Sequence, residues 1–66
     1  MPPRIRDIIK MLEDDGWRLV RFEGTSHRQY RHPHKPGTVT VAGAPGQEIG
    51  KGTLSSIRRQ AGLRDR

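Results

Sequence analysis

The sequence predicts an α+β domain in the order helix, strand, strand, strand, helix, with a three-stranded antiparallel sheet and both helices on one face of it. Two segments carry apolar residues at helical spacing, and three short segments rich in β-branched and aromatic residues lie between them, separated by turn sequences. The chain has 66 residues. A chain this short buries only about 60% of the surface that it exposes when unfolded, so we expect one domain, residues 1–66.

The first helix is expected from Pro3 to Asp15. Its apolar residues recur at positions i, i+3, i+4 and i+7, which places them on one face: Ile5, Ile8, Ile9 and Leu12. Pro3 suits the first turn of a helix, and Gly16 suits its end. Residues 13–15 are acids at the end where the helix dipole prefers cations, which indicates another role for them, such as contact with a basic surface.

Three strands are expected at residues 17–22, 27–32 and 38–41, and the short turns between them predict an antiparallel meander. Side chains alternate between the two faces of a strand. One face of the second strand would therefore carry His27, Gln29 and Arg31. The other face would carry Arg28, Tyr30 and His32.

Residues 43–52 form a glycine-rich loop, expected to be a mobile connector, and Thr53 is expected to cap the second helix. The apolar stripe of this helix is Leu54, Ile57 and Ala61. Gly62 is placed where a left-handed residue ends a helix, and Leu63 can fold back on Ile57. The free amides at the start of the helix are suited to hold a phosphate.

A strand, a glycine-rich turn containing Gly50 and Lys51, and a helix follow each other as in a phosphate-binding P-loop. The register excludes that motif, because its first glycine falls on Pro45 and its Ser or Thr is replaced by Gly52. We therefore interpret the segment as a connector.

The charge is basic and uneven. Lys and Arg number 13 against 7 Asp and Glu, which gives a net charge of +6. Residues 16–35 and 51–66 carry +4 each, whereas residues 1–15 and 36–50 carry −1 each, which sums to +6. Ten of the thirteen cations are Arg, whose planar fork of donors matches phosphate oxygens, so phosphate is the expected partner, although an Arg-rich solvated surface has the same composition.

The chain has no cysteine, which excludes disulfides and thiolate metal sites. No long apolar run and no signal-peptide pattern are present, so we expect no membrane partner and a cytoplasmic location. The three histidines are a weak metal-site candidate, because no Asp or Glu lies between residues 24 and 47. We expect no metal and no other cofactor, and we interpret His32 and His34 as turn residues or auxiliary phosphate contacts.

His27 is placed differently. It begins a strand directly after the turn containing Gly24 and Ser26, within the basic block that includes Arg21, Arg28 and Arg31. Imidazole titrates near neutral pH, so this position is suited either to proton transfer beside a phosphate or to a plain surface role. Adjacent residues of a strand face opposite ways, so Ser26 and His27 are not expected to act together in a nucleophilic triad.

Several short segments run in order over nearly the whole chain: residues 8–12, 15–17, 24–27, 30–33, 39–41, 52–54, 57 and 60–63. Together, these segments resemble the HicA (YcfA-like) family of toxin mRNA interferases. The resemblance implies a fold like that of double-stranded-RNA-binding domains. It also implies a metal-independent endoribonuclease that acts on mRNA as the toxin of a type II toxin-antitoxin system, neutralised by a HicB-type antitoxin.

The same resemblance carries the family's catalytic histidine to His27 and its turn glycine to Gly24. Many members have a proline and a second histidine after the third strand, where this chain has Ala42 and Ala44, so a two-histidine scheme is not expected. His27 would take the proton of the RNA 2′-hydroxyl while Arg28 or Arg31 stabilises the phosphorane.

The residues expected to bind RNA are Arg21, Arg28, Arg31, Lys51, Arg58 and Arg59, with Gly24 and Ser26 shaping the turn at the site. Two alternatives remain open. One is a module that binds double-stranded or structured RNA without cleaving it. The other is a protein-interaction domain whose cations meet an acidic partner.

Overall fold

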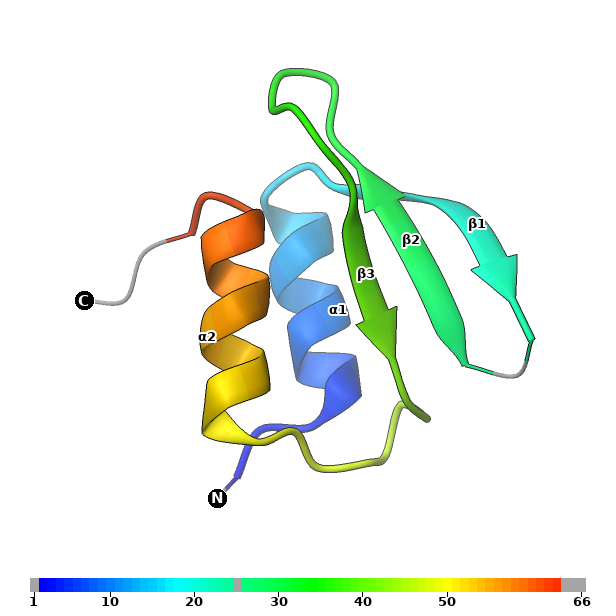
Figure 1. Cartoon of the computed structure of the whole chain (residues 1–66), viewed down its shortest axis with the longest axis vertical. Helices are drawn as coiled ribbons and strands as arrows, with labels where there is room; N and C mark the ends of the chain where they lie inside the picture. The colour runs from blue at the N-terminus through cyan, green and yellow to red at the C-terminus, as the bar shows by residue number, and fades with distance from the viewer. Residues whose placement is uncertain (1, 25, 64–66) are drawn as a thin grey trace.

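The computed structural model describes residues 2–24 and 26–63 and has the predicted order of elements. They are α1 (Ile5–Asp14), β1 (Arg18–Glu23), β2 (His27–Arg31), β3 (Val39–Ala42) and α2 (Lys51–Gln60). The strands form one antiparallel sheet in the order β1-β2-β3, with both helices on the β3 side and β1 at the far edge (Figure 1). The predicted fold is confirmed, and Thr25 of the predicted turn lies outside the described residues.

One buried cluster joins both helices to one face of the sheet. Its members come from every element except β1: Ile5, Ile8, Leu12, Trp17, Tyr30, Val39, Val41, Ile49, Ile57 and Ala61. Tyr30, Val39 and Val41 share the face that meets the helices, because Tyr30 pairs with Val39 in the register of β2 and β3. The predicted alternation along β2 is therefore confirmed, and the opposite face of the sheet is left open.

The glycine-rich segment after β3 is pinned to the start of α1, which corrects its interpretation as a mobile connector. The amide of Ile5 donates to the carbonyl of Gln47 at 2.9 Å, and the amide of Arg6 donates to that of Pro45 at 2.9 Å. Arg4 lies in an isolated β-bridge with Glu48. These contacts satisfy donors at the first turn of α1, which otherwise have no partner within the helix.

The second helix begins at Lys51 with Gly50 as its N-cap, so the prediction that Thr53 caps it is wrong. The amide of Leu54 donates to the carbonyl of Gly50 at 2.9 Å, which places Thr53 inside the first turn. Ile49 is the physical reason, because it is buried and its amide donates to the carbonyl of Pro3 at 3.0 Å, which fixes where the loop ends. The predicted end at Gly62 is confirmed: the Leu63 amide donates to the Arg58 carbonyl at 2.7 Å.

One of the acids at the end of α1, Asp15, belongs to a cluster of polar side chains. The Asp15 carboxylate accepts from Lys35 Nζ at 2.5 Å and from Trp17 Nε1 at 3.2 Å. The hydrogen bond from Lys35 is the main reason why the pKa of Asp15 is lowered from its ordinary value. Lys35 also donates to the carbonyl of Ala61 at 3.0 Å, so this ammonium ties the turn between β2 and β3 to the ends of both helices. The expected contact of this acidic end with basic residues is thus confirmed for Asp15.

His32 completes this polar cluster. Its Nε2 lies 2.7 Å from the carbonyl oxygen of Asp15, and its Nδ1 accepts from the amide of His34 at 2.9 Å. The ring packs edge-on against the buried Trp17, with 5.4 Å between ring centroids. Gly16 has a φ of +104°, and a Cβ there would lie 2.8 Å from His32 Nε2, so this approach requires glycine. His32 is therefore a structural residue of the turn.

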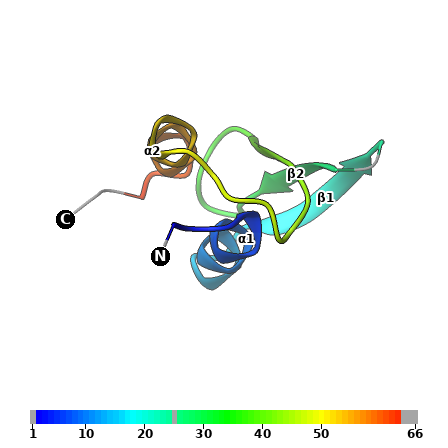
Figure 2. The same ribbon diagram turned by 90° about the horizontal axis from the view of Figure 1, so that it is seen from below.

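The strand β1 projects beyond the helices and is exposed along its whole length (Figure 2). Its pairing with β2 contains an irregularity between Leu19 and Arg21, which leaves Val20 outside the ladder. The three large apolar side chains of β1 are about half-exposed: Leu19 48%, Val20 56% and Phe22 48%. Of the apolar residues in the predicted strand, Trp17 is buried in the core, whereas Leu19, Val20 and Phe22 stay outside it.

Candidate nucleic-acid interface

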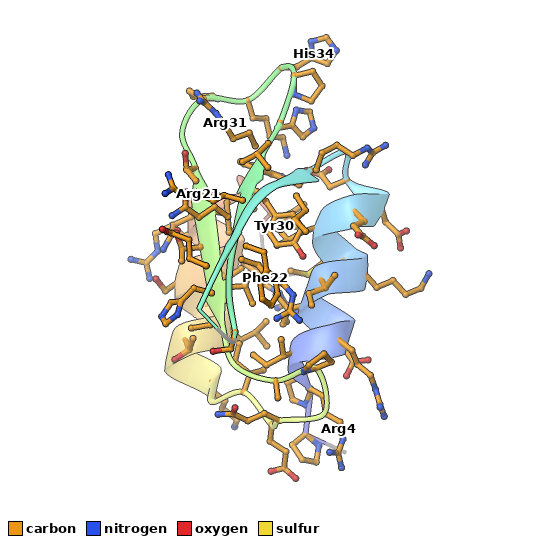
Figure 3. All side chains as sticks on the ribbon, turned by 90° about the vertical axis from the view of Figure 1, so that its right-hand side faces the viewer. Arg4, Arg21, Phe22, Tyr30, Arg31 and His34 are labelled. Carbon is orange, nitrogen blue, oxygen red and sulfur yellow. The ribbon has the colours of Figure 1, made fainter. Side chains whose placement is uncertain are left out.

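The open face of the sheet is built around His27, the first residue of β2. Its imidazole is exposed, and by register it lies between Glu23 of β1 and Ala42 of β3. The face is completed by side chains that share this register: Arg18, Arg21, Gln29, Arg31 and Thr40. Figure 3 shows Arg21 and Arg31 directed away from the α1 side, toward which Phe22 and Tyr30 point.

The turn before His27 is shaped by Gly24 and Ser26. Gly24 has a φ of +61°, the left-handed conformation that other residues seldom adopt. The carbonyl of Ser26 accepts from the amide of Gly43 at 3.3 Å, which extends the contact between β2 and β3 past His27. The turn glycine and the serine carbonyl thus fix the position of the strand at the point where the histidine stands.

Arg21 is the cation nearest to His27 by register. It pairs with Gln29, so it is the diagonal neighbour of His27 on the same face, at a Cβ separation of about 7–8 Å typical of such positions. Its guanidinium forms an ion pair with Glu23 at 3.0 Å, and Gln29 donates to the same carboxylate at 3.4 Å. A phosphate beside His27 would therefore compete with Glu23 for Arg21.

Arg31 lies on the same face four residues along β2 from His27, a rise of about 13 Å. It is paired across the strands with Arg18. Arg18 turns toward the end of α1, where its guanidinium donates to the carbonyls of Glu13 and Trp17 at 3.3 and 3.1 Å. Both arginines are exposed, but Arg18 is bonded to the end of α1, which leaves Arg31 as the cation directed over the open face at this end.

Arg28 is on the opposite face from His27. It pairs with Phe22 and with Val41, and its guanidinium carbon lies 4.9 Å from the centroid of the Phe22 ring. The same guanidinium donates to the carbonyl of Gly43 at 3.1 Å. The structure therefore brings together His27, Arg21 and Arg31 but not Arg28.

The remaining predicted cations belong to α2. Lys51 is the first residue of the helix, and Arg58 and Arg59 are in its last turn. Lys51 and Arg58 are seven residues apart, so they share one flank of the helix at a separation of about 10 Å. The helix packs on the face of the sheet opposite His27, so these cations are not part of the open face.

The other two histidines stand apart from this face. His32 is held by the polar cluster at the end of α1, and His34 is exposed with its ring 6.0 Å from that of His32. In the described part of the chain, no three His, Asp or Glu side chains gather into a group able to hold a metal ion. Of the two interpretations of His32 left open by the sequence, the structural one fits its contacts.

Sequence reasoning placed Gln29 on this face through the two-residue period but did not place Arg18, Glu23 or Thr40 there. The position of Glu23 follows from the pairing of β1 with β2, which depends on the irregularity at Val20. Ala42 is opposite His27 on β3, so this neighbour supplies no group that could transfer a proton. Of the two strand residues described as paired with His27, Glu23 is the titratable one.

The exposed His27 lies among arginines on the open side of an α-β-β-β-α sheet, so the chain is a small protein with a basic open face. A family model described as "HicA toxin of bacterial toxin-antitoxin" matches residues 5–63. The chain therefore belongs to the HicA toxin family of bacterial toxin-antitoxin systems, and a toxin of this kind implies a cognate antitoxin. No curated protein matches the chain.

A search of the described helices for one that could cross a membrane found none of sufficient length and apolar character.

Proposed function

We propose that this chain is the endoribonuclease of its toxin-antitoxin system and that it cleaves RNA with His27 as the proton acceptor. The observation that carries the proposal is the exposed imidazole on the sheet face that the helices leave uncovered, with Arg21 diagonal to it. Family membership supports a toxin, and the basic face supports a phosphate-bearing substrate.

The reaction needs few catalytic groups, because the 2′-hydroxyl of the RNA is itself the nucleophile. His27 takes the proton of the 2′-hydroxyl, and the 2′-oxygen bonds to the adjacent phosphorus. The bond from phosphorus to the 5′-oxygen breaks, that oxygen takes a proton from water, and the hydroxide left behind takes the proton from His27, which restores the free imidazole. The products are a 2′,3′-cyclic phosphate and a 5′-hydroxyl end, with no change of oxidation state and no metal required.

Arg21 is better placed than Arg28 to stabilise the charge that develops on phosphorus. It shares the face of His27, whereas Arg28 is turned to the other face and bonded to Gly43. Binding of the phosphate would draw Arg21 away from Glu23, with which it now forms an exposed ion pair. Exposed pairs of this kind contribute only about 0–1 kcal/mol, so the exchange costs little.

The test compares the purified chain with His27→Ala and with Gln29→Ala, a matched change two residues along the same face. We expect His27→Ala to lose cleavage of an RNA oligonucleotide while still binding it, and Gln29→Ala to keep most of the activity. A substrate with 2′-deoxy sugars should resist the wild-type chain, because it lacks the nucleophile. Equal cleavage by the His27→Ala variant would remove His27 from the mechanism.

The alternatives left open by the sequence give different results in the same experiment. A non-catalytic RNA-binding module would bind RNA in a salt-dependent manner, produce no new ends, and be unaffected by His27→Ala. A domain that only binds an acidic protein would show neither cleavage nor measurable RNA affinity at physiological salt.

A further inference from the structure

We propose that the free edge of β1 is where the cognate antitoxin docks, through an extended segment in which carboxylates accompany apolar residues. This inference rests on the proposed function, since it names where the partner of the toxin binds. It goes beyond that function because β1 contains neither the histidine nor the turn that shapes the site.

The first argument is that β1 carries apolar surface which the chain does not cover. Leu19, Val20 and Phe22 are the large apolar residues that the described chain leaves exposed, and all three lie on this strand. Exposed apolar side chains gathered on one element mark an interaction surface. Arg28 lies over one face of the Phe22 ring, yet Phe22 remains 48% exposed.

The second argument is the unpaired backbone of the same strand. The sheet order is β1-β2-β3, so within the described residues β1 pairs on one side only. The outer N–H and C=O groups of an edge strand are a template for an added strand, and the added backbone then supplies affinity. A protein segment satisfies the edge and covers the apolar side chains together, whereas an RNA strand has no backbone that pairs in this way.

The third argument is charge, which selects among protein partners. Arg18 and Arg21 flank Leu19 and Val20 in the sequence, and the chain as a whole carries +6. Two copies of this chain would bring like charges together, which disfavours association, whereas an acidic segment is attracted. The irregularity at Val20 bends the edge and discourages generic strand pairing, so the partner must match that bend.

The experiment uses the chain with the antitoxin encoded beside its gene. Val20→Asp removes an exposed apolar side chain and adds a negative charge at the edge. Ser55→Asp, at an exposed position on α2, is the control for charge alone. We expect Val20→Asp to raise the dissociation constant for the antitoxin by about tenfold or more, and Ser55→Asp to leave it within about twofold.

A second substitution tests the acidic character of the partner. Val20→Lys loses the same apolar contact but gains a cation, so it should weaken binding less than Val20→Asp does. The opposite order would overturn the assignment of an acidic partner segment. Both variants should keep the ribonuclease activity of the free chain, because Val20 pairs with no residue of β2 and is not among the residues assigned to the site.

Hydrogen exchange gives a readout that does not depend on any variant. In the wild-type complex, amides of residues 18–23 should exchange more slowly than in the free chain. Unchanged exchange there, or unchanged affinity of a folded Val20→Asp variant, overturns the docking site. Slower exchange caused by an RNA oligonucleotide instead, or a dimer of the free chain that Val20→Asp dissociates, also overturns it.

The failure of this inference is distinguishable from the failure of the proposed function. Absence of ribonuclease activity in the wild-type chain contradicts the proposed function alone, and the binding measurements then still decide the docking site. If the chain has full ribonuclease activity but the substitutions in β1 leave antitoxin binding unchanged, only the proposed docking site is contradicted.

Discussion

The two edge strands of this sheet differ in the burial of their side chains. On β3, Val39 and Val41 are fully buried while their neighbours are exposed, whereas every residue of β1 is exposed. Both strands are rich in apolar residues, so composition does not explain the contrast. The position of the helices explains the contrast, because they contact β3 and leave β1 projecting (Figure 1). Stability is thus concentrated beside the helices, and the surfaces proposed for recognition lie where the core ends.

The largest expected effect is the loss of Trp17, which is fully buried and packs against His32. Trp17→Ala should reduce the free energy of unfolding by about 3–5 kcal/mol, since it removes a large side chain from a small core. Phe22→Ala, an aromatic truncation on β1, should cost about 1 kcal/mol or less. Urea unfolding followed by circular dichroism measures both, and equal losses would contradict the contrast between the two regions.

The next largest effect on stability is expected at Gly16, where the backbone approaches His32 closely. Gly16→Ala should cost about 2 kcal/mol, because the added Cβ meets His32 at 2.8 Å and the φ of +104° is strained for alanine. Gly46→Ala is the matched control in the pinned loop, where a Cβ has nothing within 4 Å. Thermal unfolding of both variants tests this, and a Gly16→Ala variant as stable as the control would show that the turn can move aside.

The helical stripes and the alternation along β2 were predictable from the sequence, because each depends on residues close together in the chain. The pinned loop was not, since it depends on Ile49 and Gln47 meeting the start of α1. The exposure of β1 was not predictable either, because an alternating pattern does not say how far the helices reach. In the candidate site, the face of His27 and Arg31 followed from the two-residue period. The proximity of Arg21 and Glu23 required the register across the irregularity at Val20.

A smaller effect is expected from the ion pair of Asp15. Asp15→Asn should cost about 1 kcal/mol near neutral pH, whereas Asp14→Asn, at an exposed pair with Lys10, should cost less than about 0.5 kcal/mol. The pKa of Asp15 is lowered in the folded chain, mainly by the hydrogen bond from Lys35. As the pH falls, the Asp15 carboxylate is therefore protonated at a higher pH in the unfolded chain than in the folded chain.

The stabilisation by the Asp15 carboxylate is therefore complete above the ordinary pKa of an aspartate, about 4, and is lost as the pH falls through the lower folded value. Melting temperatures between about pH 2 and pH 6 measure it. The wild-type chain should lose more stability over that range than Asp15→Asn does. Parallel curves would contradict the role of the carboxylate.

The smallest effect on stability is expected on the open face. Arg31→Gln should change the free energy of unfolding by no more than about 0.5 kcal/mol, because the side chain is exposed. It should nevertheless reduce the slope of log K against log salt for RNA binding by about 1. Arg6→Gln, at an exposed position on α1, is the control, and an equal loss of slope there would mean that the open face holds no preferred phosphate.

The bonds that close the first turn of α1 also constrain how the chain folds. Arg4 reaches the carbonyl of Gly46 across 42 positions, and Ile5 reaches Gln47. Contacts between residues so far apart require a long loop to close before they form, which slows folding. On the ribosome, the first helix has no partner for these groups until most of the chain has emerged. The acquisition of the native state is therefore tied to near-complete synthesis, and a chain cut short before residue 45 would lack the carbonyls that accept from Ile5 and Arg6 at the start of its first helix.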